Sequence, residues 1–289
     1  MSIQLSNIGN IKEILTRHGF TFSKSLGQNF LINPTVCPRM ADYSIPDKDT
    51  CVIEVGPGIG VLTCELAKRA EKVIAIELDK RLIPVLDETL SEFDNVKIIN
   101  DDILKIDLKK LIAEEFPDKN VVVCANLPYY ITSPVIMKLL EERLPITSLT
   151  VMVQKEAAKR ICAEVGTRQC GAVTLAVNYY AKPEILFEVL AGSFMPAPKV
   201  DSAVIQLGIL TEPPVKADNE ELLFRVIKSA FAQRRKTIVN SVSSGLSMPK
   251  AQIAEILADA GVSGNARAEQ LTLKQFADIT DCLNSIIND

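Results

Sequence analysis

The chain has 289 residues, of which 47% are hydrophobic and 24% are charged, and its formal net charge is −4. This composition is typical of a soluble globular protein with a sizeable core, and the length suits one large domain with a smaller one. The single histidine, His18, argues against a histidine general base, a Ser-His-Asp triad and a polyhistidine metal site.

Cysteine usage and hydropathy indicate a reducing compartment. The seven cysteines lie between Cys37 and Cys282 without a C-x-x-C pair, so we expect neither a disulfide framework nor a zinc site. There is no unbroken apolar run of about 18 residues, and the N-terminus lacks a signal-peptide pattern. We therefore expect a cytoplasmic protein with no membrane segment and no metal. The negative net charge argues mildly against non-specific binding of nucleic acid, although a local basic face can still bind a polyanion.

The first 25 residues predict a basic N-terminal arm. A short amphipathic pattern covers residues 11–15, and Lys24 is among the cations around it. A helix is expected next, with Asn33 as its N-cap and Pro34 at its first position. Gln28-Asn29, just before it, suits either a ligand site or the ordinary polarity of a loop.

A glycine-rich turn follows the first apolar strand. Residues 51–55 predict the strand, and Gly56-Pro57-Gly58-Ile59-Gly60 leads into a helix over residues 61–69. Glycine lets the backbone approach a ligand closely. The spacing departs from the dinucleotide fingerprint G-x-G-x-x-G, and Pro57 has no N–H to offer a phosphate. A ligand without phosphates therefore fits this turn better.

Two acids follow the next two predicted strands, residues 72–76 and 96–99. Glu77 ends the first of these strands and can accept from both hydroxyls of a ribose. Asp102 follows the second and can accept from the amino group of an adenine. Each acid alone is better explained as a helix cap for the segment that follows it. Their succession after the glycine turn favours a shared ligand site at one edge of the sheet.

The fourth predicted strand, residues 121–125, ends at Asn126-Leu127-Pro128-Tyr129. Ligands of open α/β sheets bind beyond the carboxyl ends of the strands. The amide oxygen of Asn126 and the carbonyl of Pro128 could accept the two hydrogens of an exocyclic amine, while the base stacks on Tyr129. The alternative is an ordinary Asn-x-Pro turn.

The rest of the chain completes the layout. A fifth strand over residues 149–153 and two more within 185–190 and 203–207 give a seven-stranded sheet. The prolines of residues 211–216 indicate a linker, so we expect domains at 1–210 and 211–289. The second domain is helical in pattern, with cations opposite an apolar stripe that starts at residue 222. A solvated charged face is the default explanation of those cations, and RNA binding is the alternative.

Several motifs together resemble the ribosomal RNA adenine N6-dimethyltransferases, within the class I S-adenosylmethionine-dependent methyltransferases, and are most similar to the small-subunit enzymes. The resemblance covers nearly the whole chain, and its Phe-x-Pro-x-Pro-Lys-Val-Asp-Ser run is highly specific. One departure is Tyr130, where we expect asparagine in many members. The motifs are Gln28-Asn29-Phe30-Leu31, residues 54–60, Glu77-Leu78-Asp79, residues 126–130, residues 194–202 and residues 231–236.

This resemblance implies an α/β Rossmann-like sheet with a small C-terminal helical domain. It implies S-adenosyl-L-methionine as methyl donor, and as substrate two adjacent adenosines in the 3′-terminal hairpin of 16S rRNA, within the small ribosomal subunit or its precursor. We expect a monomer. The implied cofactor-binding residues are Gln28, Asn29, Leu31, Gly56, Gly58, Glu77, Asp102 and Asn126, and the catalytic ones are Asn126, Pro128, Tyr129 and Phe194. The candidate RNA-binding residues are Lys24, Lys155, Arg160, Arg225, Lys228, Arg234, Arg235 and Lys236.

Arg234 has an ambiguous place in this scheme. It falls on the apolar side of the predicted helix, so either the helix ends before it or the residue is paired at a domain interface.

Three other functions remain open at this point. One is a large-subunit rRNA adenine methyltransferase of the antibiotic-resistance type, which the Pro-Lys-Val-Asp-Ser run disfavours. Another is a non-catalytic assembly factor that binds RNA, against which the intact Glu77, Asp102 and Asn126 argue. A dinucleotide oxidoreductase is disfavoured by the glycine spacing.

Overall fold

The computed structural model describes residue 5, residues 7–21 and residues 28–288, the last without its side chain. The chain divides into two compact units. The first comprises Met1–Ala158 and Pro183–Ile209, and the second comprises Lys159–Lys182 and Leu210–Asp289. The second unit thus contains a segment from the middle of the chain in addition to the expected residues 211–289.

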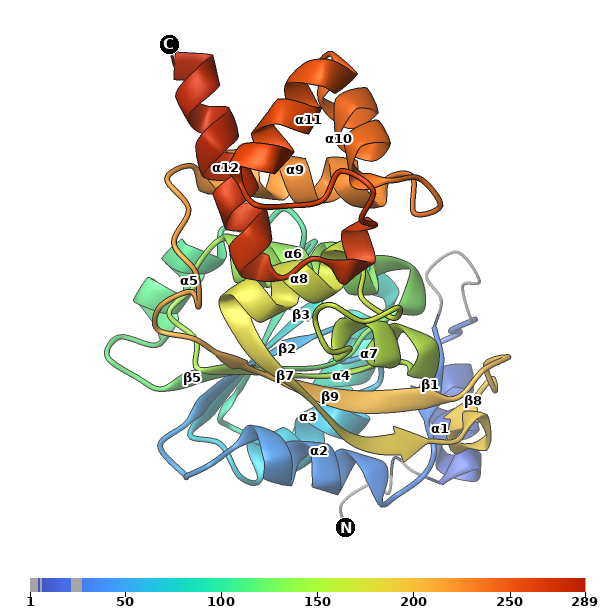
Figure 1. Ribbon diagram of the computed structural model, residues 1–289. Coiled ribbons are helices and arrows are strands. Elements are labelled where there is room, and N and C mark those ends of the chain that lie inside the picture. Colours follow the sequence, from blue (N-terminus) through green and yellow to red (C-terminus); the bar gives the residue numbers. More distant parts are fainter. Residues whose placement is uncertain (1–4, 6, 22–27, 289) are drawn as a thin grey trace. The chain divides into compact units, whose positions relative to one another are not determined.

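A seven-stranded sheet forms the centre of the first unit, as predicted, in the order β4-β3-β2-β5-β6-β9-β7 (Figure 1). The pairs from β4 to β6 are parallel, and β9 runs antiparallel to β6. β-Branched and other apolar residues fill β2 and β5, which helices cover on both faces. The strands are β2 Cys51–Val55, β3 Lys72–Glu77, β4 Val96–Asn100, β5 Val121–Asn126, β6 Ser148–Gln154, β7 Ala181–Val189 and β9 Ser202–Ile209.

Helices α2 and α3 lie on one side of this sheet and α6 on the other (Figure 1). The expected start of α2 is wrong by two residues, because Asn33 accepts from the N–H and hydroxyl of Thr35 and the helix begins after that turn. The helices of this unit are α1 Ile8–Arg17, α2 Val36–Ser44, α3 Val61–Ala67, α4 Ile83–Thr89, α5 Leu108–Glu115 and α6 Thr132–Glu141, and α7 Lys155–Ile161 crosses into the second unit.

A second, two-stranded sheet lies in the same unit. β1 (Phe30–Leu31) pairs antiparallel with β8 (Phe194–Met195), so that Leu31 is opposite Phe194. This pairing joins two motifs that are more than 160 residues apart in the sequence. It fixes the segment that follows Asn29 relative to the start of the Phe-x-Pro motif.

The second unit is helical, as its sequence pattern predicts. The apolar stripe of α9 is buried at Leu222, Leu223, Val226 and Ile227, and α9 packs against α8, α10 and α12. None of the helices in the described ranges has the length and apolar character that a membrane span requires. The helices of this unit are α8 Ala172–Tyr180, α9 Glu220–Phe231, α10 Ile238–Leu246, α11 Lys250–Asp259 and α12 Leu273–Asn288.

Candidate methyl-transfer site

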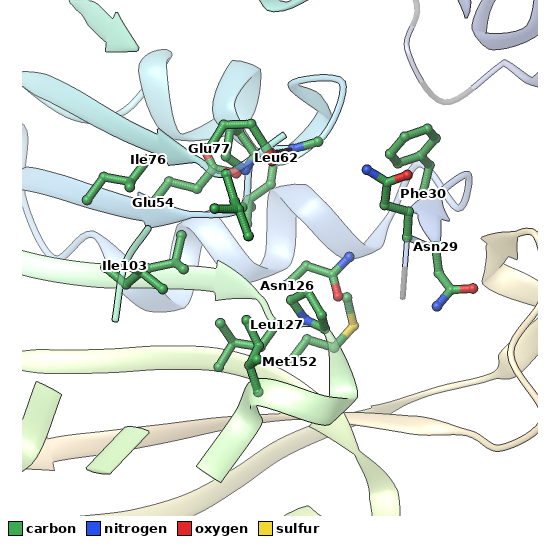
Figure 2. Close-up of a pocket in the computed structure, with 18 of the residues that line it drawn as sticks. Asn29, Phe30, Glu54, Leu62, Ile76, Glu77, Ile103, Asn126, Leu127 and Met152 are labelled. Carbon is green, nitrogen blue, oxygen red and sulfur yellow. Dashed lines mark hydrogen bonds between the residues drawn. The ribbon is translucent and has the colours of Figure 1, made fainter. Parts of the chain in front are cut away.

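A cavity of about 290 Å³ lies at the carboxyl ends of β2, β3 and β5, entirely within the first unit. Figure 2 shows Glu54 and Glu77 on one of its walls, Asn126 and Met152 on another, and Asn29 and Phe30 on a third. The lining includes every residue predicted to bind the cofactor or to act in catalysis: Gln28, Asn29, Leu31, Gly56, Gly58, Glu77, Asp102, Asn126, Pro128, Tyr129 and Phe194.

The glycine turn forms the cavity wall between β2 and α3. Gly56, Gly58 and Gly60 all have positive φ, from +61° to +88°, a region in which other residues are strained. The N–H of Gly56 donates to the carbonyl of Ile76 at 2.9 Å, which ties the turn to the end of β3. A ligand in the cavity therefore meets bare backbone here.

Glu77 is buried beside this turn. Its carboxylate accepts from the N–H of Gly58 at 3.2 Å and from the N–H of Asp79 at 2.8 Å. Burial raises the pKa of Glu77, and these two donors counteract part of that increase. The backbone N–H groups of Gly58 and Asp79 thus orient this carboxylate at the edge of the cavity.

Asp79 holds a network that the sequence alone did not predict. Its Oδ2 accepts from the side-chain amide of Gln28 at 2.9 Å and from Nη2 of Arg81 at 2.6 Å. The hydrogen bonds from Arg81 hold the pKa of Asp79 below its usual value, against the effect of burial. Asp79 therefore connects the Gln28 segment to the backbone beside Glu77.

Asp102 lies at another edge of the cavity. One carboxylate oxygen accepts from the N–H of Leu104 at 3.0 Å, and the other forms an exposed ion pair of 3.4 Å with Lys105. Both contacts are local, as expected of a turn acid. Asp102 also lines the cavity, with the buried Ile103 next to it (Figure 2).

A third acid, Glu54, lines the cavity, although the sequence did not lead us to predict it as a site residue. Its side chain is 1% exposed, and burial raises its pKa to about 8, with the hydroxyl of Thr63 opposing and Glu77 adding to the increase. In the described part of the chain, Oε2 of Glu54 has no hydrogen-bond partner. A buried, unpartnered carboxylate oxygen at a cavity wall suits a ligand that carries positive charge. The sequence does carry a signal for this site residue, because Glu54 is an acid within the otherwise apolar strand β2.

Asn126 ends β5 opposite Met152 of β6. Its side chain is partly exposed and lines the cavity beside Met152 (Figure 2). Among the residues that the structure describes, none forms a hydrogen bond with this amide. Its oxygen is therefore available to an incoming amine.

The carbonyl of Pro128 is less available than the sequence suggests. It accepts from the N–H of Ile131 at 3.1 Å and from the hydroxyl of Thr132 at 3.4 Å. A carbonyl oxygen has two lone pairs, so an amine would have to displace one of these donors. The carbonyl of Leu127 has no hydrogen-bonded partner within the described ranges, while its N–H is fixed to the carbonyl of Met152 at 3.2 Å.

The two aromatic candidates differ in exposure. Tyr129 is half-buried, and its hydroxyl lies 2.8 Å from Oγ of Ser202. Phe194 is only 3% exposed and belongs to the apolar core with Leu31. Phe194 therefore forms a packed wall of the cavity rather than an open stacking face. Tyr130, where the sequence departs from the expected asparagine, is 54% exposed.

The candidate RNA-binding residues fall into four groups. Lys24 lies outside the described residues. Lys155, in the first unit, pairs with Glu188 at 2.6 Å. Arg234 follows the end of α9 and donates to the carbonyls of Arg168 and Cys170, so the first of its two expected explanations is confirmed. The remaining candidates, Arg160, Arg225, Lys228, Arg235 and Lys236, are exposed in the second unit.

The sequence model of the ribosomal RNA adenine dimethylase family matches residues 19–285. A ribosomal RNA small subunit methyltransferase A from Alkaliphilus oremlandii is 49% identical over 274 residues, which are 94% of this chain and 96% of that protein. A protein of the same name from Geobacillus thermodenitrificans is 48% identical over 287 residues, 98% of each chain.

Two solved structures share the fold. The 23S rRNA methyltransferase ErmE has a TM-score of 0.65 and 29% identity, covering 89% of this chain and 100% of that one. A dimethyladenosine transferase from Plasmodium falciparum has a TM-score of 0.71 and 25% identity, covering 86% and 95%. These similarities confirm the expected class I methyltransferase fold. The chain therefore belongs to the ribosomal RNA adenine dimethylase family, and it is an rRNA adenine dimethyltransferase.

Proposed function

We propose that this enzyme dimethylates the N6 amines of two adjacent adenosines in the 3′-terminal hairpin of 16S rRNA, in the cytoplasm and during small-subunit biogenesis, with S-adenosylmethionine as donor. The observation that supports this most directly is the amide of Asn126, which none of the described residues binds, in the same cavity as the glycine turn, Glu77 and Asp102. A pocket that holds the methyl donor and the target adenine together needs residues for both ligands in one cavity.

The cavity residues fit the proposed donor. Glu77 would hold the ribose hydroxyls and Asp102 the amino group of the donor's adenine, while the bare backbone at Gly56 allows close approach. Oε2 of Glu54, which no described residue binds, lines the same cavity, and a cationic ligand beside it would lower the pKa of this acid from about 8 and favour its charged form. When bound, S-adenosylmethionine supplies an electrophilic methyl group on a positively charged sulfur.

The chain contributes to transfer mainly by orienting the acceptor. The lone pair of an adenine amine is delocalised into the ring, which makes it a weak nucleophile. Asn126 Oδ1 and the carbonyl of Leu127 would accept the two amine hydrogens and so favour a pyramidal nitrogen. We assign the main-chain contact to Leu127 because the carbonyl of Pro128 already has two donors. Asn126 needs no change of protonation, since the proton can leave after transfer.

The target base has to leave its stack to enter this cavity, because a paired adenine cannot present its amine there. Tyr129 would stack on the unstacked base, and Phe194 would shape the wall behind it. The RNA backbone would be bound by Lys24 and Lys155 and by the exposed cations of the second unit. We assign Arg234 a supporting role, because its guanidinium is bound to two main-chain carbonyls.

The comparisons favour small-subunit rRNA over large-subunit rRNA as the substrate. Relatives that are 48–49% identical are named for the small subunit, whereas the 23S rRNA enzyme is 29% identical. A purely non-catalytic assembly factor is disfavoured because Glu77, Asp102 and Asn126 all line one cavity. A role in subunit assembly alongside catalysis remains part of the proposal.

The variant Asn126→Ala tests this function. With small subunits from cells that lack the enzyme as substrate, it should lose methyl transfer, measured by mass spectrometry of the rRNA. It should keep its affinity for S-adenosylmethionine in calorimetry. Asn178→Ala, in α8 and outside the cavity, is the matched control and should retain activity. Normal turnover by Asn126→Ala would refute the proposed chemistry, and preferential methylation of large-subunit rRNA by the unmodified enzyme would refute the substrate.

A further inference from the structure

The hydroxyl of Tyr129 is tied to a residue of the Phe-x-Pro motif. It lies 2.8 Å from Oγ of Ser202, which is 73 positions away in the sequence. Both residues belong to the first unit. The ring of Tyr129 lines the cavity, so its outer end is fastened while part of the ring remains exposed.

Ser202 is a rigid anchor. Its side chain is 0% exposed, and it begins β9 opposite Gln154 of β6. The residue before it, Asp201, is held twice, by the N–H of Lys155 on its carbonyl at 3.0 Å and by the N–H of Ala191 on its carboxylate at 2.9 Å. The backbone at Ser202 is therefore held by the pairing with β6 and by the two bonds to Asp201.

Tyr129, by contrast, starts a single 3-10 turn, Tyr129–Ile131. Short 3-10 turns have poorer hydrogen-bond geometry than α-helices, so the turn alone constrains the ring weakly. The Tyr129 hydroxyl is neutral at neutral pH, as an ordinary phenol is, and burial raises its pKa further, so it can share a hydrogen bond with Ser202. The bond to β9 thus supplies the constraint that the turn lacks.

We propose that Ser202 is a positioning residue that fixes the plane of the Tyr129 ring, so that the ring is ready to stack on the target adenine. This inference rests on the proposed function of the cavity. Stacking requires parallel ring planes, and a ring that is already held in that plane loses less conformational freedom when the base arrives. Ser202 acts through Tyr129 and does not itself touch the base.

The simpler explanation of this hydrogen bond is that Tyr129 only provides a partner for the buried hydroxyl of Ser202. That role would affect the stability of the fold but not the stacking of the base. A double-mutant cycle on Ser202→Ala and Tyr129→Phe separates the two, because each change removes the same bond and Phe keeps the ring. Ser44→Ala is the matched control, since Ser44 is also buried and donates to the carbonyl of Met40 at 2.8 Å.

The readouts are kcat/KM for the RNA, affinity for S-adenosylmethionine, thermal stability, and the fluorescence of 2-aminopurine at the target position. We expect Ser202→Ala and Tyr129→Phe each to lower kcat/KM by roughly three- to tenfold, the usual worth of one hydrogen bond. The double variant should lose no more than the larger single loss. Both single variants should quench 2-aminopurine less, with unchanged affinity for the donor, whereas Ser44→Ala should alter stability alone.

Wild-type kcat/KM and quenching in Tyr129→Phe would overturn the inference, even if Ser202→Ala fails to fold. Losses that multiply in the double variant would also overturn it, because the two side chains would then act independently. This failure is distinct from failure of the proposed function. If Asn126→Ala loses methyl transfer while Tyr129→Phe behaves as wild type, the function stands and only the role of Ser202 is wrong.

Discussion

The side-chain amide of Gln28 donates a hydrogen bond of 2.9 Å to Oδ2 of Asp79, across 51 positions of the sequence. Asp79 also binds Arg81 through its carboxylate and donates its own N–H to Glu77. A continuous path of hydrogen bonds thus joins one wall of the cavity to the acid that we assign to the donor's ribose. Donor affinity should therefore depend on a residue that we do not place in contact with the donor.

Asp79→Asn should weaken the binding of S-adenosylmethionine. The neutral side chain loses its charge-assisted bonds to Arg81, and it has one acceptor oxygen in place of the two that accept from Arg81 and Gln28. We expect the Kd from calorimetry to rise about tenfold, with kcat at saturating donor within about twofold of wild type. Asp42→Asn is the control, because Asp42 also accepts from an arginine, Arg69, whereas only Asp79 of the two acids is bonded to residues that line the cavity, Gln28 and Glu77. An unchanged Kd would show that the Gln28 segment does not depend on this network.

Glu54 should make the protein without ligand less stable as the pH rises. Its pKa is about 8 in the fold against 4.5 ordinarily, so between these values the folded state holds a proton that the unfolded state has lost. The contribution of Glu54 to the free energy of unfolding should therefore be fully present below pH 4.5. It should fall as the pH rises from 4.5 towards 8 and stay constant above that pH. For one buried acid the total loss is about 3–5 kcal/mol.

Glu54→Gln should remove this loss, so urea unfolding at pH 5 and pH 8 should give more similar free energies than in the wild type. Glu65→Gln is the control. Burial raises the pKa of Glu65, but its bonds to Lys68 and Arg69 outweigh burial and lower the pKa overall, so its titration lies below this window. An equal pH dependence in Glu54→Gln and wild type would mean that Glu54 is charged in the fold.

The sheet and most of the cavity could be predicted from the sequence because both follow from local patterns. Runs such as residues 121–126 and 72–77 are short, apolar and rich in β-branched residues, which favours a central strand buried on both faces. The carboxyl ends of parallel strands meet at one edge, so Glu77, Asp102 and Asn126 had to lie close together. These inferences need no knowledge of side-chain contacts.

The rest depended on contacts between distant segments. Strands of two residues, such as β1 and β8, have no periodic pattern to recognise. The bond between Tyr129 and Ser202 and the grouping of Lys159–Lys182 with the C-terminal helices exist only in the folded chain. The carbonyl of Pro128 was a reasonable acceptor in sequence, but the 3-10 turn that begins after it uses its lone pairs.

Arg234 and Arg235 are neighbours in sequence with different surroundings, which gives a prediction for the second unit. Nη2 of Arg234 donates to the carbonyl of Arg168 at 3.0 Å and to that of Cys170 at 3.3 Å. Arg235 is exposed and, in the described part of the chain, has no hydrogen-bond or ion-pair partner. We therefore assign the first arginine to the fold and the second to RNA binding.

Arg234→Ala should lower the free energy of unfolding by about 0.5–1.5 kcal/mol, because two carbonyls lose a charged donor at a site that solvent can reach. Arg235→Ala should leave that free energy within about 0.5 kcal/mol of wild type, as surface changes usually do. It should weaken RNA binding and reduce the dependence of log K on log salt concentration by about one, as the loss of one phosphate contact predicts. Urea unfolding and RNA binding at several salt concentrations measure both effects. A salt dependence reduced by Arg234→Ala but not by Arg235→Ala would reverse the assignment, since the guanidinium of Arg234 would then reach the RNA despite its two carbonyl partners.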